Sequence, residues 1–180
     1  MNIEKIEMSN ITPELFNHFS RHQQVTHCWR YSDGQWKIEP VNFTEEWESE
    51  EHAQLCSHLK TTLKNGGIVL GAFSDNNQLK GFASVEGQLF GSHKQYLDLS
   101  AIHVSEDVRG QKIGRQLFLS AADFAEKQGA EKLYISSHSA VETQAFYSSL
   151  GCVDAVEPST KHTDDEPFDR QLEYRLGEIG

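Results

Sequence analysis

From residue 66 onward, short apolar segments alternate with two amphipathic segments. In the first amphipathic segment, apolar residues recur every four positions from Ile113 to Ala125. Helices are therefore predicted over 113–127 and 141–150, each closed by a glycine. Strands are predicted over 67–73, 79–86, 96–104, 132–136, 152–156 and 172–176. This order, β-β-β-α-β-α-β-β, predicts an α/β fold in which helices cover the faces of one mixed sheet.

The first part of the chain has a weaker pattern. Residues 2–8 predict a strand, 12–21 a short helix that begins with Thr-Pro, and 45–64 a longer helix. Between the two helices, 23–43 is rich in aromatic residues and has no clean period. Near the other end, the polar segment 157–170 contains two prolines and is expected to be a loop.

The chain has 180 residues, a length that predicts one domain. It carries 27 acidic and 16 basic side chains, for a formal net charge of −11. Such a surface repels nucleic acid and anionic lipid and attracts cations, so a nucleic-acid partner is disfavoured. The three widely spaced cysteines form no CxxC pair, which is typical of reduced thiols in the cytoplasm. We see neither a signal-peptide pattern nor an apolar run of ~20 residues, so a cytoplasmic protein away from membranes is expected.

The segment between Ile102 and Leu117 combines a strand end, a loop with glycines and a helix start. Arg109, Lys112 and Arg115 place three cations within seven residues of an otherwise acidic chain. A helix start exposes unpaired backbone N–H groups, and glycines let that backbone approach an anion closely. The loop is therefore suited to hold a pyrophosphate, although it matches neither G-x-x-x-x-G-K-[ST] nor G-x-G-x-x-G. On spacing alone, a tight turn with a solvated basic cap is the alternative.

These residues resemble the acetyl-CoA signature of the GCN5-related N-acetyltransferase (GNAT) family, [Q/R]-x-x-G-x-[G/A]. In that family the signature follows the fourth strand, and here it reads Arg109-Gly-Gln-Lys-Ile-Gly114, with Lys112 where glycine is usual. A second motif of the family is a helix with a tyrosine before a Gly-aromatic pair. The segment from Thr143 onward matches it, with Tyr147 as the tyrosine and Cys152 in the aromatic position.

The resemblance is specific over 96–152 and extends by element order over 67–176. It implies a single N-acetyltransferase domain over 1–180, with a mixed, mostly antiparallel central sheet that splays at the strands that bind the cofactor. Within this domain, 66–180 would form the acetyl-CoA-binding core and 1–65 would shape the acceptor site. In the family, the first two helices and their loop form that part.

The same resemblance implies transfer of an acetyl group from acetyl-CoA to a primary amine, without a metal. The strand backbone at Ile102, His103 and Val104 would contact the pantetheine arm. The other residues implied to bind the cofactor are Arg109, Gly110, Gln111, Lys112, Ile113, Gly114, Arg115, Ser139, Thr143 and Phe146. The amine would attack the thioester carbonyl, and a backbone N–H of the strand would stabilise the oxyanion.

Tyr147 matches the residue that gives a proton to the leaving thiolate in this family. A phenol with an ordinary pKa near ~10 is protonated at neutral pH and can donate. Packing on a helix face is the alternative role for Tyr147. The run of residues 136–139, Ser-Ser-His-Ser, is interpreted as the strand-to-helix loop beside the cofactor.

Asp98 is the first candidate for the base that takes the proton of the amine. It lies eleven residues before Arg109, the offset of the catalytic glutamate in the histone-acetylating members of the family. On a strand of period two, we expect Asp98 to share a face with Ser100, Ile102 and Val104, and His103 to point to the opposite face. A hydrogen-bonded structural aspartate is equally open. His103, Glu86 and a chain of waters are the remaining routes for the proton.

The acidic balance favours a small cationic acceptor such as a polyamine or an aminoglycoside. A protein N-terminus or lysine as acceptor, another acyl-CoA as donor, and a non-catalytic acyl-CoA-binding module stay open as alternatives. Dimers through sheet edges or C-terminal strands are common in the family, so a homodimer is also left open. His18 and His22 are interpreted as a solvated pair, because no third metal ligand follows nearby.

Overall fold

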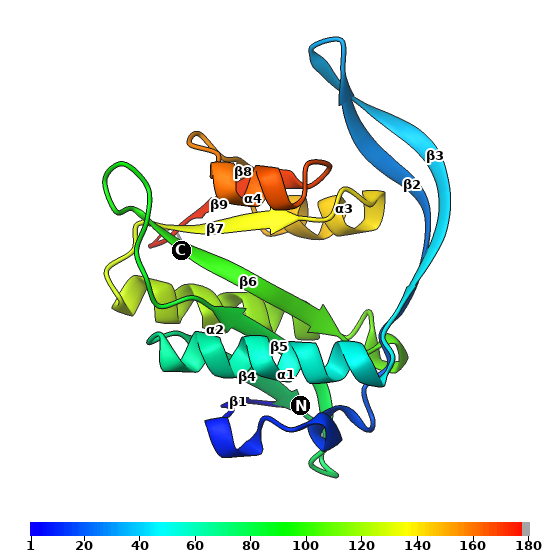
Figure 1. Cartoon of the computed structure of the whole chain (residues 1–180), viewed down its shortest axis with the longest axis vertical. Helices are drawn as coiled ribbons and strands as arrows, with labels where there is room; N and C mark the ends of the chain where they lie inside the picture. Colours follow the sequence, from blue (N-terminus) through cyan, green and yellow to red (C-terminus); the bar gives the residue numbers. More distant parts are fainter. Residues whose placement is uncertain (178–180) are drawn as a thin grey trace.

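A central sheet of seven strands organises the part of the chain that the structure, a computed structural model, describes, residues 1–177 (Figure 1). The strand order is β1-β4-β5-β6-β7-β9-β8. Neighbouring strands are antiparallel except β6 and β7, which are parallel. The strands are β1 (Asn2–Lys5), β4 (Ile68–Phe73), β5 (Leu79–Val85), β6 (Tyr96–Val104), β7 (Lys132–Ser137), β8 (Val153–Asp154) and β9 (Arg170–Arg175). The predicted α/β fold with a mixed sheet flanked by helices is confirmed.

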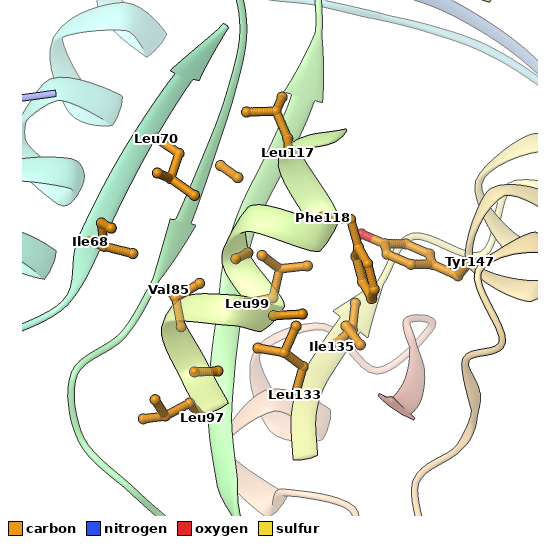
Figure 2. Close-up of a cluster of buried hydrophobic side chains, with 14 of the residues drawn as sticks. Ile68, Leu70, Val85, Leu97, Leu99, Leu117, Phe118, Leu133, Ile135 and Tyr147 are labelled. Atoms are coloured by element: carbon orange, nitrogen blue, oxygen red, sulfur yellow. The ribbon is translucent and has the colours of Figure 1, made fainter. Parts of the chain in front are cut away.

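Helix α2 (Ile113–Lys127) is the crossover that a parallel pair of strands requires, and it covers one face of the sheet. Its apolar stripe includes Leu117 and Phe118, which pack against Leu97 and Leu133 of the strands (Figure 2). Both α2 side chains are fully buried, and each stabilises the fold by roughly 1.5–3 kcal/mol. The four-residue spacing of the sequence therefore correctly predicted which face of this helix is inside.

Helix α1 (Ser49–Lys64) covers the opposite face of the sheet over β4 and β5 (Figure 1). Its Cys56 and Leu59 join a second apolar cluster with Val69 and Phe82. Helix α3 (Val141–Ser149) lies on the same side as α2, because its Tyr147 packs into the α2 cluster. The sheet is thus a middle layer between two apolar layers.

The parallel strands β6 and β7 separate early along their length. They pair only from Tyr96↔Lys132 to Asp98↔Tyr134, and beyond that point they diverge. A bulge accompanies the separation: Ser84 pairs with Ala101 and Val85 with Leu99, so one extra residue of β6 is accommodated between them. Such a bulge bends a strand and changes which side chains share a face. The splayed sheet that the family resemblance implied is present.

The segment before α1 forms a long antiparallel hairpin, β2 (His22–Ser32) and β3 (Gln35–Glu46). In Figure 1 it rises on one side of the molecule from the start of α1 to beyond α3. A backbone bridge between Cys28 and Ala140, and a 2.8 Å hydrogen bond from Trp29 N–H to the Ser139 carbonyl, attach it to the loop after β7. We had expected an irregular segment between two helices here, as in the family; the second helix is present as α1, but a hairpin takes the place of the irregular segment.

Three local predictions also need correction. The predicted helix over 12–21 is only a 3₁₀ turn, Pro13–Phe16, because the buried Phe16 ends it and the chain enters β2 soon after. The helix over 45–64 begins later, at Ser49, since the residues before Glu48 pair within the hairpin and Glu48 forms a capping box with Glu51. The predicted loop over 157–170 contains a short helix, α4 (Thr160–Asp165). No helix within residues 1–177 is long and apolar enough to span a bilayer.

Candidate active site

A cavity of about 950 Å³ opens where β6 and β7 separate. Its walls come from β6, the end of β7, the start of α2 and one side of α3, and Gln23 and Gln24 of the hairpin close another side. Small-molecule and cofactor sites in proteins have volumes of roughly 300–1,000 Å³, so this space suits a substrate of some size.

The loop before α2 forms one end of the cavity. Gly110 (φ 81°) and Lys112 (φ 63°) both have left-handed backbone, which turns the chain sharply into the helix. Lys112 is the N-cap residue, and its ammonium has no acceptor atom for the first N–H groups of the helix; no acidic side chain lies in that first turn of the described chain. The positive end of α2 is therefore open, with Arg109 and Arg115 beside it on the cavity wall. These features suit the binding of an anion.

Gly114 lies where α2 and α3 meet. A Cβ atom at this position would lie 3.1 Å from the Phe146 ring and 3.6 Å from Val104. Glycine in the first turn of a helix is unfavourable by up to about 1 kcal/mol relative to alanine, and the close approach of Phe146 is the compensation. All three residues line the cavity.

The β6 strand offers backbone groups to the cavity. Its inner edge pairs with β5, but beyond Asp98 its outer edge pairs with no strand of the described chain. Ile102, His103 and Val104 line the cavity along this free edge, so N–H and C=O groups there can bind a ligand. The ring of His103 lies 4.7 Å from Trp47, and burial, with the charges of Arg21 and Arg109, lowers its pKa to about 3. His103 is therefore neutral in solution near pH 7.

Two of the predicted cofactor-binding residues lie outside the cavity wall, and all the others line it. Gln111 is exposed at the tip of the loop between Gly110 and Lys112. Ser139 is buried, and its hydroxyl accepts a hydrogen bond from the Arg30 guanidinium. Ser139 therefore holds the hairpin in place.

Tyr147 of α3 lines the cavity, and its side chain extends toward Phe118 of α2 (Figure 2). Its ring centroid lies 5.1 Å from that of Phe146 and 6.5 Å from that of Phe118. Burial raises the pKa of its phenol well above the usual value, and the nearby Cys152 and Asp169 raise it further. The hydroxyl makes no hydrogen bond to a residue of the described chain. It is thus a protonated, unengaged donor at the wall of the cavity.

Asp98 has a different position from the one we predicted. Leu97 and Leu99 face α2, and after the bulge Ile102 and Val104 face α2 as well. Asp98 therefore lies on the opposite face from Ile102 and Val104.

That face is the one on which His103 packs against Phe82, so the prediction that His103 and Asp98 point to opposite faces is wrong too. Asp98 accepts a 2.9 Å hydrogen bond from His162 Nε2 of α4, and this bond raises the pKa of His162. Asp98 does not line the cavity. Glu86, the other candidate carboxylate, accepts a 2.7 Å hydrogen bond from Thr62 and also lies outside the cavity wall.

Glu45, a carboxylate that is shared by two residues of the cavity wall, was not identified from the sequence. Glu45 of β3 pairs with Arg21 on one side and lies 3.4 Å from His138 Nε2 on the other. Arg21 and His138 both line the cavity, as do Ser136 and Ser137 of the loop that we expected beside the cofactor. The three partners are far apart in the sequence, so no local spacing could reveal them.

A model of the Acetyltransferase (GNAT) family matches residues 27–152, more than two thirds of the chain. The chain belongs to the GNAT acetyltransferase family. The match includes β6, α2, β7 and α3, the four elements that form the cavity. A search of curated protein sequences found no match.

Solved structures share the fold of this GNAT acetyltransferase at low sequence identity. A provisionally assigned streptothricin acetyltransferase from Bacillus anthracis str. Ames, in complex with acetyl coenzyme A, has a TM-score of 0.71 and 15% identity, over 97% of this chain and 99% of that one. A nourseothricin acetyltransferase has a TM-score of 0.66 and 16% identity, over 97% and 96%. An aminoglycoside 6'-N-acetyltransferase complexed with coenzyme A has a TM-score of 0.59 and 13% identity, over 97% of each chain.

Proposed function

We propose that this GNAT acetyltransferase moves an acetyl group from acetyl-CoA to a primary amine of a small cationic molecule. The observation that carries this proposal is the single cavity that joins the open end of α2 to Tyr147 along the free edge of β6. An enzyme that uses a CoA thioester needs three parts: an anion site, a row of backbone groups and a proton donor.

The cofactor would lie along this cavity from the α2 loop inward. Backbone N–H groups from Gly110 to Gly114 would bind the pyrophosphate, with Arg109 and Arg115 adding charge-assisted hydrogen bonds. Gln111 would contribute through its backbone alone. The β6 edge at Ile102 to Val104 would pair with the pantetheine amides.

The chemistry would take place where β6 and β7 diverge. A backbone N–H of β6 would stabilise the negative charge that develops on the thioester oxygen. Tyr147 would give its proton to the leaving thiolate, since its raised pKa keeps the phenol protonated at any working pH. His103 is too weak a base to help, because its pKa is lowered to about 3.

The acceptor would bind between the hairpin and the face of the sheet opposite α2, so that residues 1–65 shape its site and 66–180 bind the donor. The net charge of −11 supports a cationic acceptor. The names of the structural neighbours support a small-molecule acceptor, since one is a streptothricin acetyltransferase and another an aminoglycoside 6'-N-acetyltransferase.

Calorimetric titration with acetyl-CoA and a thiol-release assay on a panel of amines test the proposal. We expect micromolar binding of acetyl-CoA and amine-dependent release of CoA. Absence of acetyl-CoA binding at millimolar concentration would refute the donor site. Tight binding without release for any amine, unaltered in Tyr147→Phe, would instead support a non-catalytic acyl-CoA-binding protein.

A further inference from the structure

Ser136 marks the point where the sheet opens on the face away from α2. Leu133 and Ile135 of β7 pack into the α2 cluster, so Tyr134 and Ser136 face the other way. Tyr134 belongs to the last residue pair between β6 and β7, and Ser136 is the next β7 residue on that face. Ser136 also lines the cavity. A group that touches its hydroxyl therefore lies close to the point where β6 and β7 begin to diverge.

Asp169, just before β9, touches that hydroxyl. Ser136 Oγ donates a 3.2 Å hydrogen bond to Asp169 Oδ2, and Gln171 Nε2 donates a 3.0 Å hydrogen bond to Ser136 Oγ. The serine is therefore oriented with its proton toward the carboxylate. The second oxygen, Oδ1, accepts no hydrogen bond within residues 1–177. The solvent-inaccessible polar side-chain atoms without a partner in that part of the chain are Arg21 Nε and His52 Nε2, so Oδ1 is not one of them. Oδ1 is thus accessible to solvent, and Asp169 reaches the cavity only through its contact with Ser136, since it is not itself a lining residue.

The carboxylate of Asp169 has no cationic partner in the described chain. The two nearby guanidinium groups point elsewhere: Arg170 bonds Asp154 at 2.8 Å, and Arg30 bonds Ser139 and lies over the Phe168 ring. By contrast, Asp98 is paired with His162. A half-buried carboxylate without a counter-charge gains free energy when a ligand brings a cation to it.

Three charged groups face Asp169, one from its own loop and two from other segments. They are Glu166 before it in the loop, Glu45 of β3, and His138 after β7. Burial, followed by the negative charge of Glu166, raises the pKa of Asp169, while Ser136 and His138 act in the opposite direction. Asp169 in turn raises the pKa of Tyr147, as Asp98 does, so both carboxylates lie within electrostatic reach of the phenol.

We propose that Asp169 binds the ammonium group of the acceptor and takes its proton. This inference rests on the acetyl transfer proposed above and adds the group that receives the amine. The position beside Ser136 presents the amine on one side of the divergent strands, and Tyr147 approaches from the side of α2 and α3. The two proton-transfer groups are thereby separated, as a base and an acid for one reaction must be.

The proposed step balances as follows in atoms and charge. A proton passes from the ammonium nitrogen to Asp169 and leaves a lone pair on the amine. The nitrogen bonds to the thioester carbonyl carbon, the C–S bond breaks, and the sulfur leaves with the electron pair and takes a proton from Tyr147. The nitrogen loses a second proton, which returns through solvent to Tyr147, and Asp169 releases the first proton to solvent.

The test compares Asp169→Asn and Asp169→Glu with a control, Asp123→Asn. Asp123 is an exposed carboxylate of α2 and pairs with Lys127. Each protein is assayed for CoA release with spermidine, streptothricin and kanamycin, for acetyl-CoA binding by calorimetry, and for binding of the same amines to the CoA-loaded protein.

We expect Asp169→Asn to lower kcat/KM for the best amine by about 100-fold or more, with the acetyl-CoA Kd changed less than about twofold. Its remaining rate should rise with pH up to the pKa of the amine. Asp169→Glu should recover part of the rate, and Asp123→Asn should match the wild type. A kcat/KM within about threefold of the wild type in Asp169→Asn, with the same pH profile, would overturn the inference.

The binding measurements separate this inference from the transfer itself. A wild type that binds an amine through Asp169 but releases no CoA would refute acetyl transfer and retain the ammonium site. Undiminished amine binding by Asp169→Asn overturns the inference whatever the turnover. A wild type that binds none of the three amines overturns it as well.

Discussion

Gly114 of α2 and Phe146 of α3 lie in direct contact, and a Cβ atom on Gly114 would lie 3.1 Å from the Phe146 ring. This pair sets the separation of two helices that border the anion site. A side chain at position 114 therefore has to displace an aromatic ring that also lines the cavity.

Gly114→Ala should weaken acetyl-CoA binding by about tenfold and destabilise the fold slightly. Alanine gains up to about 1 kcal/mol of helix propensity, but overpacking against Phe146 costs about 1–3 kcal/mol, so the steric effect prevails. Calorimetry and urea unfolding measure the two quantities. The double variant Gly114→Ala/Phe146→Leu should regain much of the binding, and an unchanged Kd in the single variant would argue against this contact as a spacer.

Tyr147→Phe should lower kcat by roughly 100-fold or more while the acetyl-CoA Kd stays the same, because it removes only the proton donor. The protein should remain as stable as the wild type to within about 1 kcal/mol, since the hydroxyl has no hydrogen-bond partner within residues 1–177 to lose. In the wild type, no loss of activity from deprotonation of Tyr147 is expected up to about pH 10, because its pKa is raised. A fall in kcat of less than threefold would assign Tyr147 to packing.

The Asp98–His162 pair should make stability depend on pH. The hydrogen bond to Asp98 raises the pKa of His162 above its unfolded value of about 6.5. This contribution is complete below about pH 6.5 and is lost as pH rises through the folded pKa. Urea unfolding at pH 6 and 8.5 should show a loss on the order of 0.5–1 kcal/mol that is absent in His162→Gln. An equal pH dependence in both proteins would contradict the assignment.

Glu45→Gln should loosen the hairpin, because it removes the carboxylate shared by Arg21 and His138. The Arg21 side chain is only 11% exposed, and burial already lowers its pKa, so loss of its counter-charge should destabilise the fold by about 1–3 kcal/mol. Urea unfolding measures the stability, and hydrogen exchange should show faster opening in β2 and β3. Exchange confined to other elements would show that the bridge does not hold the hairpin.

The cysteines should be inert in the native protein, which makes thiol detection a clean assay for released CoA. Burial raises the pKa of Cys152 to about 12 and that of Cys56 above its usual value, and Cys28 is fully buried. A thiolate is the reactive form, so alkylation by iodoacetamide at pH 7.5 should label none of the three within minutes. Mass spectrometry of intact protein checks this, with urea-unfolded protein as the positive control.

The sequence predicted well wherever one face of an element is buried against another. The stripe from Ile113 to Ala125 determined the inward face of α2, and the apolar strands after residue 66 determined the sheet. The hairpin was not predicted, because its strands lack such a buried face. In β2 only Val25 and Cys28 are buried, so its residues show no continuous apolar face.

Some residues of the candidate site could also be predicted from the sequence, and others could not. Residues within one loop or helix, from Arg109 to Gly114 and around Tyr147, could be identified because their spacing is local. The face of Asp98 could not, because the bulge at β6 inserts one residue into a period of two. Asp169 is joined to Ser136 across 33 positions of the sequence, and only the folded sheet brings the two together.

The hairpin joins two halves of the sheet that share only three residue pairs, Tyr96↔Lys132 to Asp98↔Tyr134. It is attached to the loop after β7 at Cys28, and Ser20, two residues before β2, is hydrogen-bonded to Ser105 and Glu106 where β6 ends. Under the proposed function, a donor that enters between β6 and β7 would bear on the wall against which the acceptor rests. The two substrates are then thermodynamically linked, and each should change the affinity of the other by the same factor.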